Sequence, residues 1–412
     1  MMHSPHSKAS QTFILVTIFL DVLGIGLIIP VLPSLIGTLT DSQAAQAHWY
    51  GWLASAFGIM QFLCMPFLGA LSDRYGRRPV LLLSTFGLGI SYLVTALSHS
   101  LWLLLLARLV SGATSATMSV ANAYVADITS PEQRAKAFGK VGAAFGIGFV
   151  FGPMLGGTLG AIDLRLPFMV AAALSLLNVL YGYFVLPESL NPAKRSVLHW
   201  RQVNPFGALL HLSRLKNVGS LVVIFSCSAL GQFILHTTWV LYTEFRFNWT
   251  PQQNGIALFV VGLTSALVQG LLMGRLLVVF GEFRLAIVGM MSSFIITTSY
   301  GLTTNSLYLY PLIMCNFLSF AANPALNSLI SKSAGEHEQG LVQGALNGIN
   351  SLMMIIAPLI GSWILAHVSH LPSNDWRMGS SFFASASLQL LAVSLAIWHF
   401  NKHHRQMIKR EP

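Results

Sequence analysis

Long apolar segments follow one another along almost the whole 412-residue chain, and short polar breaks separate them. Most are about 20 residues or longer, the length an α-helix needs to cross a bilayer core of about 30 Å. The pattern predicts an all-α membrane protein with twelve transmembrane helices. Their expected limits are 12–36, 48–70, 79–97, 101–123, 135–160 and 166–186, then 219–243, 252–275, 283–303, 306–330, 338–366 and 377–400.

The longest polar break lies between the sixth and seventh predicted helices. It predicts an N-terminal six-helix bundle over residues 1–190, a cytoplasmic linker over 191–217, and a C-terminal six-helix bundle with a short cytoplasmic tail over 218–412. At an offset of 205 residues, Gly76 aligns with Gly281 and Pro153 with Pro358. Because each half has an even number of spans, this repeat predicts two bundles related by an axis along the membrane normal, with a cavity between them.

Charge is scarce and unevenly placed. Charged residues make up 9% of the chain, against about 25% in soluble proteins. If both termini are cytoplasmic, nineteen of the 23 Lys and Arg residues lie in inner segments and three lie in outer loops. Since cytoplasmic loops carry an excess of basic residues, this distribution predicts that both ends are inside. It also explains the net charge of +10 without a nucleic acid partner.

Two charged residues lie deep inside predicted spans, at least seven residues from either end. Asp21 lies in the first helix, where a carboxylate costs roughly 2.5–3.5 kcal/mol on insertion scales and must be paired, hydrated or protonated. It could bind a transported proton or form a structural ion pair. Arg108, in the fourth helix, could neutralise Asp21, bind an anionic substrate group, or fix helix packing. Because a guanidinium keeps its proton, its role would be electrostatic.

The fifth predicted helix, "GAAFGIGFVFGPMLGGTLG", is rich in glycine. Its candidate residues are Gly148, Gly152, Pro153, Gly156 and Gly157. Small residues let two helices approach closely, and proline removes a backbone hydrogen bond and favours a bend. Two interpretations therefore stay open, helix packing and a hinge that lets the two halves rock.

Polar residues inside the spans are candidates for the lining of a substrate cavity, or for hydrogen bonds between helices. They are Gln61, Asn122, His236, Gln269, Asn316, Asn323, Asn327, Gln343, Asn347 and Asn350. The chain carries no phosphate-binding loop and no clustered Cys and His at metal-ligand spacing. We therefore expect no enzyme activity, no cofactor and no metal, and a proton gradient as the energy source.

Several motifs resemble the major facilitator superfamily and, within it, the drug/proton antiporters. "GALSDRYGRR" resembles the signature between helices 2 and 3, "GPMLGG" the antiporter motif of helix 5, and "LARLVSGATSA" the helix-4 arginine motif. "DVLGIGLIIPVLP", "VADITSPEQRAKAFG" and "WVLYTEFRFNW" are similar to the tetracycline-resistance exporter family. The resemblance implies a charge network at the cytoplasmic gate. Its candidate residues are Gly69, Asp73, Arg74, Gly76, Arg77, Arg78, Asp127 and Arg134.

The chain departs from those exporters at three positions. They carry an acidic residue where Ser91 stands, another where Ser293 stands, and in some members a histidine where Ser265 stands. These positions bear on coupling and on recognition of a metal-chelated drug. Asp21 is therefore left as the main carboxylate, and tetracycline itself stays an open question as substrate.

Together these features predict proton-coupled efflux of a small amphipathic molecule, a drug of the tetracycline type, across the bacterial inner membrane by alternating access. The expected partners are the substrate, protons and the lipid bilayer, and the protein is expected to act as a monomer. Two rivals stay open: an exporter of an endogenous metabolite such as a siderophore, and a membrane sensor that transports nothing. Proton stoichiometry is not set by the sequence.

Overall fold

Helices make up the fold. The computed structural model describes residues 5–196, 219–333 and 339–408, and no strand occurs among them. The helices of the first half are α1 (Pro5–Ile28), α2 (Leu32–Gly37), α3 (Gln43–Tyr75), α4 (Arg77–Leu97), α5 (Leu101–Ala113), α6 (Thr117–Ile128), α7 (Arg134–Ile162) and α8 (Leu166–Val185). Those of the second half are α10 (Gly219–Phe247), α11 (Pro251–Leu267), α12 (Met273–Leu302), α13 (Leu309–Cys315), α14 (Ser319–Ser333), α15 (Gln339–Val368) and α16 (Ser380–Ile408).

Eleven helical segments of the described residues are long and apolar enough to cross a membrane. One of them, Pro251–Leu302, contains 52 residues, which as a helix would extend about 78 Å. That length exceeds two bilayer cores, and the segment is interrupted by non-helical backbone at Gly281. It therefore contains the two predicted spans 252–275 and 283–303, and the prediction of an all-α membrane fold with twelve spans is confirmed.

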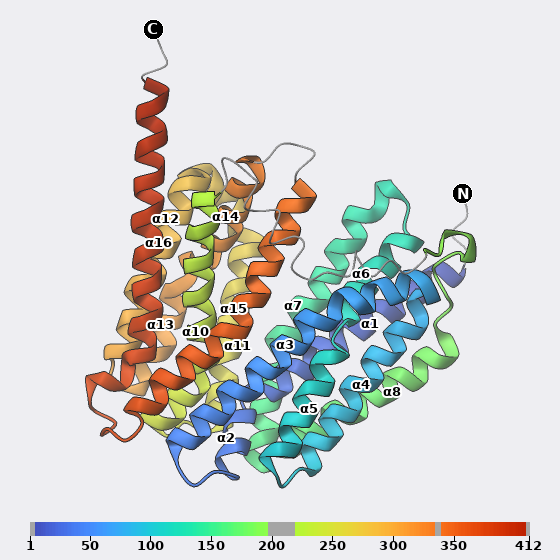
Figure 1. Ribbon diagram of the computed structural model, residues 1–412, viewed down its shortest axis with the longest axis horizontal. Coiled ribbons are helices and arrows are strands. Elements are labelled where there is room, and N and C mark those ends of the chain that lie inside the picture. Colours follow the sequence, from blue (N-terminus) through green and yellow to red (C-terminus); the bar gives the residue numbers. More distant parts are fainter. Residues whose placement is uncertain (1–4, 197–218, 334–338, 409–412) are drawn as a thin grey trace. The chain divides into compact units, whose positions relative to one another are not determined.

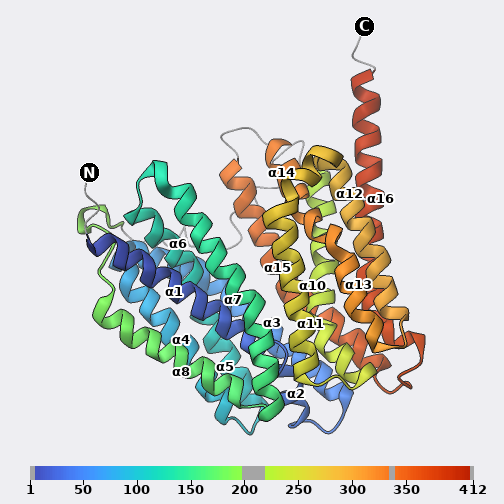
Figure 2. The same ribbon diagram turned by 180° about the vertical axis from the view of Figure 1, so that it is seen from behind.

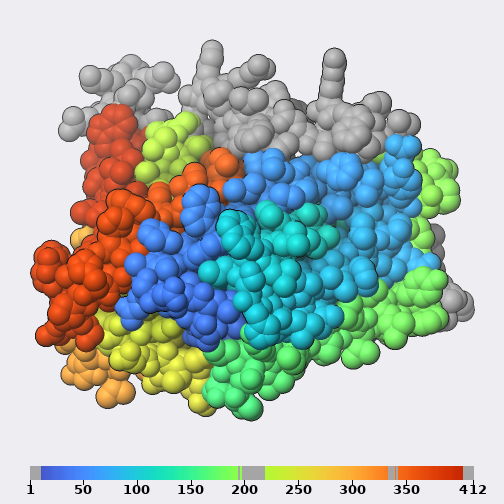
Figure 3. Space-filling view, turned by 60° about the horizontal axis from the view of Figure 1, so that its bottom comes forward, coloured from blue at the N-terminus to red at the C-terminus, as the bar shows by residue number. Residues whose placement is uncertain are grey.

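The first of two compact units comprises Met1–Ser42, Trp52–Pro205 and Trp249–Gly262. Within it α1 runs beside α7, and α4 runs beside α8, as both ribbon views show (Figures 1 and 2). Buried apolar side chains from α1, α4, α6 and α7 form its core, among them Phe13, Val80 and Tyr124. Large apolar side chains also stay exposed, such as Trp102 of α5, whose helix lies at the surface in the space-filling view (Figure 3, cyan).

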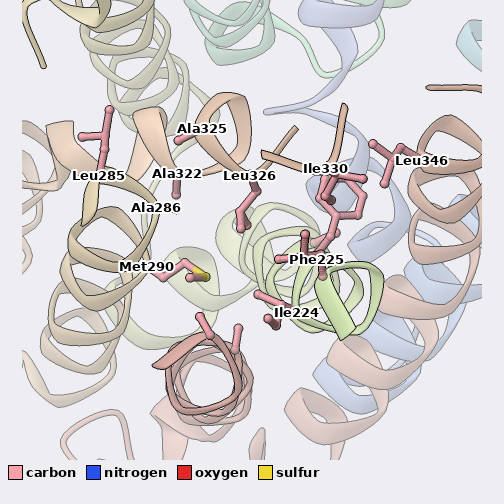
Figure 4. Packing of buried hydrophobic residues seen from close by; sticks show 14 of the residues in the cluster. Ile224, Phe225, Leu285, Ala286, Met290, Ala322, Ala325, Leu326, Ile330 and Leu346 are labelled. Atoms are coloured by element: carbon pink, nitrogen blue, oxygen red, sulfur yellow. The ribbon is translucent and has the colours of Figure 1, made fainter. Parts of the chain in front are cut away.

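The second unit comprises Gln43–Gly51, Phe206–Asn248 and Leu263–Pro412. In this unit α10 packs against α15 and α16, and α12 packs against α14 and α16. Figure 4 shows the core that results, with Phe225 of α10, Met290 of α12 and Leu326 of α14 directed into it. α10 packs against three helices, α14, α15 and α16. Its sequence is apolar on more than one face, as burial of a helix requires.

Two long helices each contribute to both units. Residues Gln43–Gly51 of α3 count with the second unit, where the Gln46 side-chain amide donates to the Glu244 carboxylate at 2.9 Å. The start of α11 counts with the first unit, where Gly255 packs against Gly157 of α7. The predicted division into residues 1–190 and 218–412 stays a prediction, and most of the predicted linker lies outside the described residues.

The internal repeat appears in the backbone. Among the described residues, Gly76 and Gly281 are the only glycines with positive φ, at 110° and 68°, and their ψ values are 160° and 164°. They are the two glycines that the offset of 205 residues aligns. Glycine adopts this conformation without steric cost, which explains its presence at both turns.

The fourth helix of each half is broken, whereas continuous helices were predicted over 101–123 and 306–330. In the first half the break lies between α5 and α6, and in the second a 3₁₀ turn at Asn316–Leu318 joins α13 to α14. At the first break Gly112 lies against the backbone of Phe57, and the Thr114 side chain covers Gly87 of α4. These close approaches are made by tertiary packing, so hydropathy could not predict them.

Candidate functional site

Asp21 lies in α1, half-buried within the first unit. The hydroxyl of Thr117, the first residue of α6, faces its carboxyl group. Tyr92 of α4 is buried and lies within electrostatic range of both Asp21 and Arg108 of α5. Gly24, almost one turn after Asp21, lets the Tyr92 ring pack on α1, since a Cβ there would be 3.3 Å from Cε2. Tyr92 thus lies between electrostatic influences from α1 and α5, and Thr117 of α6 lies next to Asp21.

The turn between α3 and α4 gathers the predicted gate charges around Arg77. Its guanidinium forms ion pairs with Asp73 at 2.5 Å and with Asp127, near the end of α6, at 3.2 Å. It also donates to the Ser72 hydroxyl at 2.7 Å. The guanidinium is mostly buried, with 12% of the side chain exposed. This turn therefore ties the beginning of α4 to the end of α6.

Other candidates in this network bind different partners. Arg134 donates to the carbonyl of Ala126 at 3.4 Å and forms no ion pair among the described residues. Arg78 donates to the Tyr183 carbonyl at 2.5 Å. Arg74 lies over the ring of Tyr75. At Gly69 no atom lies within 4 Å of where a Cβ would be, so its backbone is accessible.

Glu188, which the sequence analysis did not single out, caps the start of α4. Its carboxylate accepts the backbone N–H groups of Arg77 and Arg78 at 2.8 Å and 3.2 Å. Helix N-termini leave such N–H groups without partners and favour negative charge. Gly76 makes the contact possible, because a Cβ there would overlap the Glu188 carboxylate. A sequence signal existed in the "PES" triplet directly after the sixth predicted helix.

The glycines of α7 form a contact surface for α1. A Cβ on Gly148 would lie 2.9 Å from the Phe19 carbonyl oxygen, and one on Gly152 would lie 2.8 Å from Gly26 Cα. Gly156 packs against the backbone of Leu27 in the same way. The packing interpretation of this motif therefore has a direct structural basis. The hinge interpretation, with Pro153 inside α7, stays a prediction.

The amide residues predicted for a cavity lie in varied surroundings. Asn316, Asn323 and Asn327 each have a buried side-chain oxygen that accepts no hydrogen bond. Asn316 lies in the 3₁₀ turn, and the other two lie in α14. His236, Gln343 and Asn347 are exposed, and Asn122 and Asn350 are half-buried. Gln61 donates to Ser115 at 2.9 Å and Gln269 donates to Ser265 at 2.8 Å.

Ser91, Ser265 and Ser293, the three serines at which the resemblance to the tetracycline exporters breaks down, all take part in hydrogen bonds. Ser91 donates to the Ala107 carbonyl at 2.7 Å and so joins α4 to α5. Ser293 accepts the Gln232 amide at 2.9 Å and joins α12 to α10. Ser265 accepts from Gln269 on the following helical turn. Two of the three serines therefore connect neighbouring helices.

Comparisons with known proteins agree with this architecture. The family model of the Major Facilitator Superfamily matches residues 14–358. The class C tetracycline resistance protein of Escherichia coli is 38% identical over 387 residues, which is 94% of this chain and 96% of that protein. The class B protein of the same organism is 35% identical over 91% of this chain and 94% of its own length.

Solved structures match over nearly the whole chain as well. The human organic anion transporter MFSD10 (TETRAN) is 27% identical, with a TM-score of 0.66 over 96% of this chain and 100% of that one. The nucleoside transporter NupG superposes with a TM-score of 0.77 over 95% of this chain and 98% of its own. At 15% identity the second match shows the fold alone.

The helical fold and the charged residues held within it define a multi-pass membrane transporter of small molecules, not an enzyme. The chain belongs to the Major Facilitator Superfamily and, within it, to the family of the tetracycline resistance proteins.

Proposed function

We propose that the protein exports a small amphipathic molecule, a drug of the tetracycline type, across the bacterial inner membrane in exchange for protons. Relatives named as tetracycline resistance proteins and a multidrug resistance protein of Bacillus subtilis support a drug as the substrate. The observation that carries the proposal is the position of Asp21 next to Thr117 and Tyr92 within the first unit, where Tyr92 is also within electrostatic range of Arg108.

In this proposal Asp21 binds the proton that drives export. Its neutral form suits a low-dielectric surrounding, and its charged form needs a partner. Arg108 supplies the fixed positive charge that stabilises the carboxylate after the proton has left. One proton that crosses 100 mV releases about 2.3 kcal/mol. Because about 1.4 kcal/mol corresponds to a tenfold change in an equilibrium constant, that energy can concentrate a solute roughly fifty-fold.

The gate and the remaining candidates complete the proposed cycle. Both termini face the cytoplasm, so the ion pairs of Arg77 lie at the inner mouth and loosen when the halves rearrange. The polar residues of the spans line the path of the substrate, and the glycines of α7 permit the rocking movement. No cofactor takes part, and the monomer is the working form.

The test compares Asp21→Asn with Asp41→Asn in inverted membrane vesicles. Asp41 is exposed and precedes α3, so it provides a carboxylate control. We expect native protein and Asp41→Asn to release protons from the vesicles when substrate is added, and Asp21→Asn to release none while its unfolding temperature is unchanged. Full proton-coupled export by Asp21→Asn would remove Asp21 as the proton site.

The same vesicles distinguish the rival functions. A screen of drugs and of metabolites, including siderophores, identifies the substrate by the proton movement that it induces. Tetracycline belongs in the screen because Ser91, Ser265 and Ser293 replace residues of the tetracycline exporters. If no compound in either group moves protons through native protein, the transport proposal fails and a sensor is favoured.

A further inference from the structure

Two turns related by the repeat of 205 residues share one backbone arrangement. Gly76 and Gly281 both have positive φ, and the next residue of each begins a helical segment. Both of these residues are charged, but with opposite sign. Arg77 begins α4, and Glu282 begins the part of α12 that follows Gly281.

Each of these charges has a partner near the end of the next membrane span. Arg77 Nε lies 3.2 Å from Asp127 Oδ2 near the end of α6, and Lys332 Nζ lies 2.8 Å from Glu282 Oε1 near the end of α14. Asp127 and Lys332 are again 205 residues apart. We call Arg77–Asp127 the first clasp and Glu282–Lys332 the second clasp. The second repeats the position of the first with both charges inverted.

The inversion changes how each clasp interacts with the helix dipoles. A helix N-terminus favours negative charge and a C-terminus favours positive charge. The first clasp opposes this rule at both ends, with Arg77 at a beginning and Asp127 in a last turn. The second obeys it at both ends, because Glu282 follows the break and Lys332 lies in the last turn of α14.

The hydrogen bonds around each clasp also differ in how they relate to the helix dipoles. The first clasp depends on Glu188, a carboxylate from beyond α8, to supply the negative charge that the start of α4 needs. The second clasp needs no additional carboxylate, because Glu282 itself supplies the negative charge at the helix start. The Ser328 hydroxyl, one turn before Lys332 on α14, donates to Glu282 Oε1 at 2.6 Å. Two donors on one face of α14 therefore hold Glu282.

We propose that the second clasp stays closed throughout the transport cycle and positions α14, whereas the first clasp is the one that opens. Glu282 and Lys332 are thus positioning residues, distinct from the moving gate. The claim about the cycle rests on the proposed transport function. The claim that the pair holds α14 in place does not, so the two are tested by separate measurements.

The transport measurement links the second clasp covalently. In a background with Cys64, Cys227 and Cys315 replaced by serine, Glu282→Cys and Lys332→Cys are combined and then joined by a short bifunctional thiol reagent. We expect the unlinked protein to transport several-fold more slowly than its background, and the link to restore the rate. Native-like transport without the link, or loss of the remaining transport on linking, would overturn the proposal.

The stability measurement uses charge reversal in detergent. Glu282→Lys and Lys332→Glu each place like charges together, so each should lower the unfolding temperature, and the double variant should recover part of the loss. An exposed ion pair predicts a coupling of roughly 1.4- to fivefold in the folded-to-unfolded ratio. Recovery should be incomplete, because the reversed pair opposes the helix dipoles.

Arg284→Glu is the matched control, since Arg284 is an exposed basic residue two positions after Glu282 and its reversal should have little effect. A double variant whose loss equals the sum of the two single losses would contradict the clasp. If native protein moves no screened compound, the proposed function fails on its own, and this cycle still decides whether the pair holds α14.

Discussion

Replacing Gly156 by alanine should weaken the packing of α1 against α7. A Cβ on Gly156 would lie less than 3.0 Å from the carbonyl oxygen, carbonyl carbon and Cα of Leu27. All three are backbone atoms, so no side-chain rotation relieves the overlap, and the two helices must separate. Overpacking of this kind typically costs about 1–3 kcal/mol.

Gly146 provides the control on the same helix. Nothing lies within 4 Å of where its Cβ would be, and alanine is the better helix former by about 1 kcal/mol in soluble helices. Gly146→Ala should therefore leave the protein as stable as before or slightly more so. The measurement is the thermal unfolding of detergent-solubilised protein, followed with a dye that reacts with newly exposed thiols.

We expect Gly156→Ala to lower the unfolding temperature by several degrees, and Gly146→Ala to leave it unchanged or raise it. Equal shifts for the two variants would refute the packing argument. The same variants also test the hinge interpretation of α7. If Gly156→Ala unfolds at the native temperature but transports slowly, the glycine serves movement and not packing.

Two further predictions concern carboxylates outside the membrane. Glu188→Ala should destabilise the start of α4 by about 0.5–2 kcal/mol, as loss of a helix cap does. The backbone amides of Arg77 and Arg78 should then exchange hydrogen with solvent faster than in the native protein. Unchanged exchange at both amides would exclude Glu188 as the cap of α4. Hydrogen bonds from Arg377 lower the pKa of Asp375 from 3.8 to about 2, so this pairing stabilises the turn above about pH 4 and is lost as the pH falls toward 2. The unfolding temperatures of native protein and Asp375→Asn should therefore differ at neutral pH and converge in acid, and a constant difference would contradict this assignment.

Hydropathy and the positions of glycine and proline predicted most of the transmembrane helices. The fifth and sixth spans were expected at 135–160 and 166–186, and the helices run over Arg134–Ile162 and Leu166–Val185. Gly76 and Gly281, which the offset of 205 residues aligns, both adopt positive φ. Such features are local, because an apolar run or a glycine of positive φ depends mainly on the residues themselves.

Features made by tertiary contacts were not predicted. In the sequence, nothing distinguishes Tyr92 from the other aromatic residues of the apolar helices. It lies near Asp21 only because α1 packs against α4 at this point. Arg246 is one of the three basic residues that the charge count places in outer loops, yet it is buried in the second unit. There it donates to the Gly301 carbonyl at 2.7 Å and to the Tyr242 hydroxyl at 3.0 Å. A charge count cannot reveal a buried arginine at the end of a span.

The structure also bears on Ser91, where the resemblance to the tetracycline exporters implies an acidic residue. The Ser91 hydroxyl donates to the Ala107 carbonyl of α5, and an ionised acid has no proton to donate to that oxygen. An aspartate at this position would therefore face a carbonyl lone pair in a buried place, where an uncompensated charge is costly. The serine is matched to this α4–α5 contact, and an acid there would require a different local arrangement. Asp21 is the only acidic residue at least seven residues from both ends of a predicted span, so the proposed proton coupling assigns the proton to Asp21.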